Sequence, residues 1–431
     1  MATLGIVDGA VLRPDLTVER ADILIDTTTG TIERIDPSIP ETDETLAASG
    51  GLVIPGLVNA HTHIAMTLLR GVADDKPVDA WLEEDIWPVE AELTDADIRV
   101  GTELGAIELI KSGTTAFGDM YFELPAIADA VDRAGLRARL GYGIVTVGKD
   151  DDAVEAEITR GVELATRLDG AGDGRIRTAF MPHALTTVDP SAVASALPEI
   201  RDAGIPVHFH ANENPAFVDP IIEEHGMRPL EYADEWGWLA SGDWLAHCVH
   251  VDETEIELLA ERDVGVAHCP ASNMKLASGA APISAMADAG VQIGIGTDGA
   301  ASNNDLDMFG EMRDAAMLGK LAGEDASAVP AEMALQMATS ASAETIGLPG
   351  GELVEGGVAD LAVIDFSAPN LNPIHDHVSH LVYAANGANV RHTVCDGRVL
   401  MRDREVLTLD EATVRTRARD HASRLIDRAG P

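Results

Sequence analysis

Short apolar segments alternate with helix-like segments through the middle of the chain. Continuous apolar runs of this kind are typical of parallel strands that are buried on both faces. They lie near residues 53–60, 114–118, 136–145, 176–182, 206–210, 243–247, 264–268 and 291–297. Most are followed by a pattern of helical period, as in Asp97–Lys111, Asp152–Leu168, Pro190–Ala203 and Glu253–Arg262. Eight strands with intervening helices is the count of a (β/α)8 TIM barrel, so we predict this α/β fold.

The two ends of the chain have a different pattern, in which short strands are separated by turn residues. Such segments lie at Ala21–Ile25, Gly30–Ile35, 359–365, 390–395 and 397–401. We predict that residues 1–55 and 350–431 combine into one small composite β-sandwich domain, with a final helix from Leu409 to Arg428. Residues 56–349 would then form the barrel, a division that suits a chain of 431 residues.

Hydropathy and cysteine content favour a protein of the cytoplasm. We find no run of eighteen uncharged apolar residues and no basic leader at the N-terminus, so we expect neither a membrane span nor a signal peptide. Three cysteines cannot make a disulfide framework, which agrees with a reducing compartment. Cys248 and Cys269 each follow a histidine, so a soft metal ligand is conceivable, but buried and inert thiols are favoured.

The formal net charge of −43 disfavours one class of partner and indicates the kind of environment in which the protein works. Nucleic acid is disfavoured because its binding needs a positive surface. The acidic residues are dispersed in short clusters such as Glu83–Asp85 and Glu223–Glu224, and only 5 of the 30 basic residues are lysine. This composition favours a halophilic source, where salt screens the self-repulsion of the surface. An acidic binding face is the alternative.

Histidine and aspartate residues end several predicted strands. His61 and His63 follow an apolar run, and side chains two positions apart on an extended segment point to the same side. His210 and Asp298 end two later strands. One His-x-His pair is weak evidence, but several strand ends that finish in metal-ligand types are not expected by chance. Three imidazoles and a carboxylate suit one divalent ion, most of all Zn2+, with Fe2+ or Mn2+ possible.

A metal-activated hydroxide needs a proton carrier within hydrogen-bond reach. Glu213 lies three residues after His210 and fits this role, although a helix-start residue or a surface charge is the alternative. His247 ends the next strand and could hold or polarise the attacking water, or be a core histidine.

Three further histidines end or lie in predicted strands. His183 ends the fourth predicted strand at the same end of the barrel as the predicted metal ligands, and we expect it to contact substrate. We expect a packing or supporting role for His268, because Pro270 follows it closely. His208 has the parity of His210 but lies deeper, so we expect it to be structural.

Five motifs together resemble the amidohydrolase superfamily, and most closely its methylthioadenosine/S-adenosylhomocysteine deaminases, near the triazine chlorohydrolases. They are Pro55–His63, His210–Glu213, Leu245–Cys248, Ser272–Leu276 and Gly296–Asn304. The resemblance covers nearly the whole chain. It implies a barrel with one metal ion and a composite β-sandwich, and the lack of a lysine at the end of the fourth strand agrees with a single metal. Homo-oligomerisation rests on the family alone.

The resemblance also implies a reaction and a substrate site. Hydroxide would attack C6 of an adenine ring, Glu213 would protonate N1, and ammonia would leave, with His247 and Asp298 assisting. Trp81 would pack against the nucleoside and Glu90 would accept hydrogen bonds from the ribose hydroxyls, while His183 would contact the purine. Without the resemblance, Trp81 is equally a packing residue on a helix and Glu90 a solvated charge.

The chain departs from this branch after the third strand. Members that take S-adenosylhomocysteine use arginines there to hold the amino-acid carboxylate, but residues 141–159 contain none. Tyr142 stands in their place, and Lys149 is the only basic residue of this stretch. A carboxylate that faced Asp150–Asp152 would be repelled. We therefore expect methylthioadenosine, 5′-deoxyadenosine or adenosine to be preferred over S-adenosylhomocysteine.

Other functions compete with this hypothesis. The nearest is the same machinery acting on another amino- or chloro-substituted heterocycle such as guanine, cytosine or a triazine. A binding or assembly protein that has lost catalysis would lack a ligand or the proton shuttle, and the sequence lacks neither. A phosphatase would need a basic or glycine-rich phosphate cradle, and we see none near the predicted strand ends.

Overall fold

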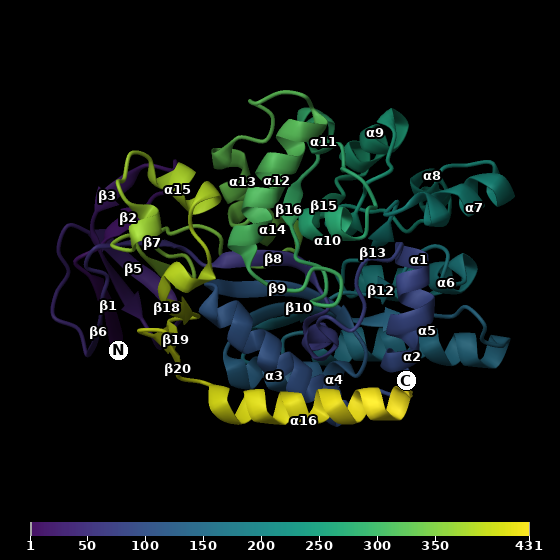
Figure 1. Cartoon of the computed structure of the whole chain (residues 1–431), viewed down its shortest axis with the longest axis horizontal. Coiled ribbons are helices and arrows are strands. Elements are labelled where there is room, and N and C mark those ends of the chain that lie inside the picture. Colours follow the sequence, from purple (N-terminus) through teal and green to yellow (C-terminus); the bar gives the residue numbers. More distant parts are fainter. Residues whose placement is uncertain (1, 431) are drawn as a thin grey trace.

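Parallel strands and helices alternate through the central part of the chain, as the computed structural model of residues 2–430 shows (Figure 1). One sheet contains β8 (Leu57–Thr62), β9 (Thr114–Tyr121), β10 (Arg137–Ile144) and β11 (Ile176–Thr178), and β12 (Met181–Pro182) also pairs with β10. A second sheet contains β13 (His208–Ala211), β14 (Trp244–His247), β15 (Gly265–His268) and β16 (Ile293–Ile295). A strand therefore occupies each of the eight predicted positions.

Backbone contacts join the two parallel sheets on both sides. Isolated parallel bridges link Phe180 to Val207 and Ala184 to His210, next to β12 and β13. On the other side, the backbone N–H of Asp298 donates to the carbonyl of His61 over 3.0 Å. These contacts bring the C-terminal ends of β8, β13 and β16 to one region of the molecule, where the predicted ligands lie.

Helices connect and cover the central strands, and acidic residues start several of them. Thr94 and Asp97 form a capping box, and Asp150, Asp189 and Asp252 accept hydrogen bonds from the first turns of later helices. A carboxylate at this position satisfies free backbone N–H groups and complements the helix dipole. The helices of this part are α3 (Asp95–Lys111), α4 (Leu124–Ala134), α5 (Asp151–Leu168), α6 (Pro190–Asp202), α7 (Pro215–His225), α8 (Pro229–Glu235), α9 (Glu253–Arg262), α10 (Pro270–Lys275), α11 (Ile283–Asp288), α12 (Met308–Ala322), α13 (Ala331–Met337) and α14 (Ser340–Thr345).

A short helical region separates β8 from α3. It contains η1 (Ile64–Leu69), α1 (Val78–Ala80), the π-helix η2 (Trp81–Ile86) and α2 (Trp87–Glu90). Two residues of the proposed substrate site, Trp81 and Glu90, lie in this region. Among the helices between residues 2 and 430, none combines the length and the apolar composition that crossing a membrane requires.

Strands from both ends of the chain share one mixed sheet. In this sheet β7 (Gly51–Pro55) pairs antiparallel with β17 (Leu361–Asp365), with Pro55 opposite Leu361. The other members are β2 (Ala10–Leu12), β3 (Val18–Arg20), β18 (Val390–Cys395), β19 (Arg398–Arg402) and β20 (Glu405–Val406). A four-stranded sheet of β1 (Thr3–Val7), β4 (Asp22–Asp26), β5 (Thr31–Asp36) and β6 (Glu44–Ala47) shares an apolar core with it.

The C-terminal helix α16 (Glu411–Ala429) lies along α3, at the lower edge of Figure 1. Arg417 and Arg428 pair with the buried carboxylates of Glu103 and Asp97 on α3. The guanidinium of Arg428 also donates to the carbonyl of Glu92, two residues after Glu90. Shorter elements near the C-terminus are η3 (Pro369–Leu371), α15 (His377–Tyr383) and η4 (Gly387–Asn389).

Candidate metal centre

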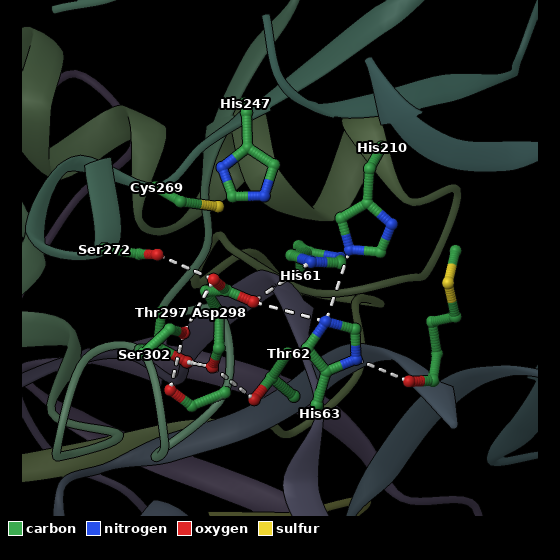
Figure 2. A network of polar contacts seen from close by, with 12 residues as sticks. His61, Thr62, His63, His210, His247, Cys269, Ser272, Thr297, Asp298 and Ser302 are labelled. Atoms are coloured by element: carbon green, nitrogen blue, oxygen red, sulfur yellow. Dashed lines mark hydrogen bonds and ion pairs between the residues drawn. The ribbon is translucent and has the colours of Figure 1, made fainter. Parts of the chain in front are cut away.

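Three histidines and one aspartate come together where β8, β13 and β16 end (Figure 2). One ligand atom from each of His61, His63, His210 and Asp298 lies within 4.8 Å of the others. Asp298 Oδ1 is 3.2 Å from His63 Nε2 and 3.5 Å from His61 Nε2, and the Nε2 atoms of His63 and His210 are 3.3 Å apart. These are the four residues that the sequence predicted as ligands, and their donor atoms face one another.

Each of the three histidines uses its other ring nitrogen in a hydrogen bond. His63 Nδ1 donates to the carbonyl of Met120 over 2.6 Å, and His210 Nδ1 donates to the carbonyl of His183 over 2.8 Å. His61 Nδ1 lies 2.9 Å from Nε2 of His208. Such outer contacts fix ring orientation and leave Nε2 available as a ligand. His61 Nε2 is buried and has no hydrogen-bond partner within residues 2–430, as expected of an atom that binds a cation.

The charges in this cluster suit a divalent cation. Although burial opposes ionisation, the adjacent imidazoles of His61 and His63 hold the pKa of Asp298 well below its ordinary value. Burial lowers the pKa of His61 to about 4 and holds that of His210 well below the usual range, so both rings are neutral ligands. Burial lowers the pKa of His63 too, but Asp298 outweighs it and raises the pKa to about 9. A cation would take the place of the proton that Asp298 attracts there.

The second carboxylate oxygen of Asp298 is held by two hydroxyl groups. Ser272 and Ser302 each donate to Asp298 Oδ2 over 2.7 Å (Figure 2). The backbone of Asp298 is left-handed, with φ of 58°, and its carbonyl accepts from the Thr62 hydroxyl over 2.9 Å. The carboxylate is therefore fixed with Oδ1 directed at the histidines.

Glu213 and His247 lie side by side next to the donor cluster. Glu213 Oε2 is 4.0 Å from His247 Nε2, and His247 Nδ1 is 2.9 Å from Oδ1 of Asn273. Burial raises the pKa of Glu213, which favours its taking up a proton. His247 is a non-glycine residue with φ of 71°, a conformation that carries strain and is often found at functional sites.

A cavity of about 450 Å³ opens from the metal-donor cluster. Its lining includes every residue that the sequence assigned to catalysis or substrate binding: Trp81, Glu90, His183, Glu213, His247 and Asp298. The Trp81 indole N–H points to the carbonyl of Ala73 over 3.3 Å, and the Tyr121 hydroxyl donates to Glu90 over 2.7 Å. His183 Nδ1 lies 2.9 Å from the Thr187 hydroxyl.

A group of polar residues lines the cavity near the end of β10. The Tyr142 hydroxyl donates to Glu157 over 2.8 Å, and Lys149 Nζ lies 2.7 Å from the other oxygen of the same carboxylate. The Asp150–Asp152 run instead begins α5, where Asp150 accepts from the Ala153 N–H. The carboxylate that lines the cavity here is thus Glu157, a residue that sequence reasoning did not single out.

His208, His268 and two cysteines are buried residues that are not among the four metal donors. His208 was expected to be structural, and it forms a hydrogen bond with His61, a proposed metal ligand. The only feature of the sequence that pointed to this contact is that His208 lies two residues before His210, on the same side of the strand. Cys248 and Cys269 are free, buried thiols, and burial raises the pKa of both. His268 is buried at the end of β15, and its Nδ1 has no partner in the described part of the chain.

A parallel α/β fold with this donor set at its strand ends is that of a metal-dependent hydrolase. The chain belongs to the amidohydrolase family, whose sequence profile matches residues 52–400. It is 60% identical over 429 residues to a 5-methylthioadenosine/S-adenosylhomocysteine deaminase of Natronomonas pharaonis, covering 100% of this chain and 99% of the relative. It is 43% identical to a 5′-deoxyadenosine deaminase of Methanothermobacter thermautotrophicus, covering 89% of this chain and 90% of the relative.

Two solved structures have the same overall arrangement. A zinc-bound adenosine deaminase of Xanthomonas campestris is 36% identical and has a TM-score of 0.93, covering 98% of each chain. A zinc complex of an atrazine chlorohydrolase of Arthrobacter aurescens is 25% identical and has a TM-score of 0.88. That match covers 97% of this chain and 100% of the other.

Proposed function

We propose that this protein is a hydrolytic deaminase of adenosine-type nucleosides, with one divalent ion, Zn2+, bound by His61, His63, His210 and Asp298. The names of the relatives and the zinc in the similar structures support the substrate class and the metal. The observation that carries the proposal is the single cavity that the donor cluster shares with Glu213, Trp81 and Glu90.

The residues of the cavity divide the proposed reaction between them. The ion, when bound, supplies Lewis-acid activation of water. Glu213 moves one proton of the water to N1 of the adenine ring, so that the C6 carbon becomes more electrophilic, and the second proton of the water leaves with the amino group as ammonia. His247, next to the cluster, and Asp298, one of its members, assist the attack of water on C6. Adenosine and water give inosine and ammonia, and the other nucleosides give the corresponding hypoxanthine product.

The other lining residues recognise the nucleoside. Trp81 packs against it, His183 contacts the purine, and Glu90 accepts hydrogen bonds from the ribose hydroxyls. Because the Tyr121 hydroxyl already donates to one oxygen of Glu90, the carboxylate is held in one orientation and has free lone pairs for a diol.

The 5′ substituent is proposed to be uncharged. Lys149 and Glu157 neutralise each other where the cavity passes β10, and the Tyr142 hydroxyl is also committed to Glu157. No arginine is found among the residues that line the described cavity. A terminal carboxylate therefore lacks a cation to pair with, so methylthioadenosine, 5′-deoxyadenosine and adenosine are the preferred substrates over S-adenosylhomocysteine.

The architecture that carries this site is proposed to be a closed (β/α)8 barrel over residues 56–349. The links between the two parallel sheets at Phe180–Val207 and at His61–Asp298 support closure. The shared core of the two outer sheets supports a composite β-sandwich made from residues 1–55 and 350–431.

An ultraviolet assay of adenine-to-hypoxanthine conversion tests the function. Methylthioadenosine, 5′-deoxyadenosine, adenosine and S-adenosylhomocysteine are compared in high salt, because a charge of −43 destabilises the fold where it is not screened. We expect turnover of the first three, loss of activity on chelation and recovery with added zinc. Absence of turnover on all four, by folded protein that binds one zinc ion, would refute the proposal.

The alternative substrate class is another amino- or chloro-substituted heterocycle. The similarity to an atrazine chlorohydrolase favours it, since the same donor set could activate water for either ring. Guanine, cytosine and a chlorinated triazine therefore belong in the same assay. Turnover of one of these in preference to the nucleosides would establish this alternative and would leave Glu90 without a ribose to bind.

A further inference from the structure

His208 occupies a distinctive place beside the metal-donor cluster. Its Nδ1 lies 2.8 Å from the carbonyl oxygen of Trp244, and its Nε2 lies 2.9 Å from His61 Nδ1. A carbonyl can only accept, so the proton of the His208 ring is on Nδ1. The ring is 1% exposed and is paired with no carboxylate in the described structure, which favours the neutral form.

The tautomer of His208 determines that of His61. Because Nδ1 of a neutral His208 carries the hydrogen, its Nε2 is an acceptor, and His61 Nδ1 must donate to it. The lone pair of His61 is then on Nε2, a buried atom that makes no hydrogen bond in the described structure and lies 3.5 Å from Asp298 Oδ1. His208 therefore presents His61 to the donor cluster in the form that binds a metal.

Contacts through Trp244 connect His208 to β8, the strand that carries His61. It stacks on Trp244, with ring centroids 4.4 Å apart and an interplanar angle of 17°. The Trp244 indole N–H donates over 3.1 Å to the carbonyl of Ala60, the residue before His61. The position of His61 is thus fixed from its backbone and from its ring.

His61 differs from the other two histidine ligands in this respect. His63 and His210 direct Nδ1 to backbone carbonyls, which no substitution removes. His61 directs Nδ1 to a side chain. We infer that His208 is a positioning residue, which orients His61 and sets its tautomer through this imidazole–imidazole hydrogen bond and so strengthens metal binding. This inference rests on the metal site of the proposed function.

Two substitutions of His208 test the inference through metal affinity. His208→Phe keeps a flat ring on Trp244 but removes the acceptor, whereas His208→Gln keeps an acceptor oxygen. The zinc dissociation constant is measured by competition with a chromophoric chelator, beside the melting temperature of the chelator-treated protein. We expect His208→Phe to weaken zinc binding by about 10- to 100-fold, the usual effect of losing such a partner. His208→Gln should recover part of the affinity, and the chelator-treated proteins should melt within a few degrees of each other.

His268→Phe is the matched control, because it replaces another buried histidine at a strand end that makes no hydrogen bond to a proposed ligand. We expect wild-type zinc affinity from it. Unchanged affinity in His208→Phe would overturn the inference, and so would an equal loss in His268→Phe, which would assign the loss to packing. If the wild-type protein itself bound no zinc, the proposed function would fail instead, so the two failures are distinguishable.

Discussion

The two ends of the proposed active-site cavity are built in different ways. At the metal end, the donors come from the ends of parallel strands, and backbone carbonyls, serine hydroxyls and His208 hold them in place. At the nucleoside end, Trp81 and Glu90 come from a short helical region between β8 and α3, and Tyr142 and Glu157 from β10 and α5. Near this end Trp87 is 39% exposed and Val147 is 60% exposed, whereas His61 is fully buried.

This difference separates two kinds of effect. Under the proposed function, groups at the metal end touch the reacting atoms, so changes there should act on kcat. Groups at the nucleoside end are proposed to touch parts of the substrate that do not react, so changes there should act on KM and on the choice between substrates. Variants from the two ends therefore test whether the cavity is divided in this way.

The largest effect is expected from Glu213→Gln, because an amide cannot carry the proton. We expect kcat to fall by about 10²- to 10⁴-fold. The zinc content should remain unchanged, since Glu213 is not among the four donors. Glu223→Gln, an exposed glutamate on the following helix, is the control and should retain wild-type kcat. Loss of zinc from Glu213→Gln would break the proposed separation of proton carrier and metal ligands.

A smaller effect is expected from Glu90→Gln. Loss of a charged acceptor for the ribose hydroxyls costs roughly 1.5–3 kcal/mol. We therefore expect kcat/KM to fall by about 10- to 100-fold, mostly through KM, with the steady-state rate as the measurement. Glu92→Gln, an exposed neighbour, should behave as wild type. An effect of Glu90→Gln on kcat alone would place Glu90 in the chemistry rather than in binding.

The pH dependence of KM sharpens the same test. Burial raises the pKa of Glu90, and the hydrogen bond from Tyr121 only partly offsets this. The carboxylate therefore gains its proton at a higher pH than an exposed glutamate, and a protonated oxygen accepts hydrogen bonds poorly. We expect KM of the wild-type enzyme to rise as the pH falls through this range. The rise should be absent from Glu90→Gln.

The smallest effect is expected from Glu157→Gln. This change leaves Lys149 without its carboxylate partner, so its ammonium group becomes available to a substrate carboxylate. A partly exposed ion pair such as this one contributes roughly 1 kcal/mol or less, and we expect kcat/KM for S-adenosylhomocysteine to rise by only about two- to fivefold. Methylthioadenosine, which carries no carboxylate, is the matched comparison and should be turned over as before. An equal change for both substrates would contradict a role in selecting the 5′ substituent.

The same contrast explains how far the sequence predicted the site. His61, His63, His210 and Asp298 could be found because the ends of parallel strands meet at one edge, so that strand periodicity alone places them together. The eight central strand positions followed from the same apolar runs. Closure of the barrel and the two-domain division remain predictions.

Residues outside this regularity were harder to predict. Trp81 lies in a π-helix and Glu90 in a four-residue helix. The sequence of this region shows neither a strand period nor a helix period. Only a resemblance to known deaminases pointed to these two residues. Glu157 lies on a long helix among many surface acids, so its position on the cavity could not be told from charge alone. His208 was placed correctly in the interior, but its hydrogen bond depends on the relative position of two strands that are distant in sequence.

The pairing of β7 with β17 has a consequence for how the protein is made. The ribosome completes Pro55 about 300 residues before its partner Leu361, and at roughly 5–20 residues per second the interval is on the order of 15 to 60 s. In that interval β2 is available to pair with one edge of β7, whereas β17, the partner of the other edge, has not yet been made. This unpartnered edge directly precedes the strand that carries His61. An open strand edge is a template for aggregation. Chains that end early would therefore carry the metal ligands and still be candidates for chaperones and proteases.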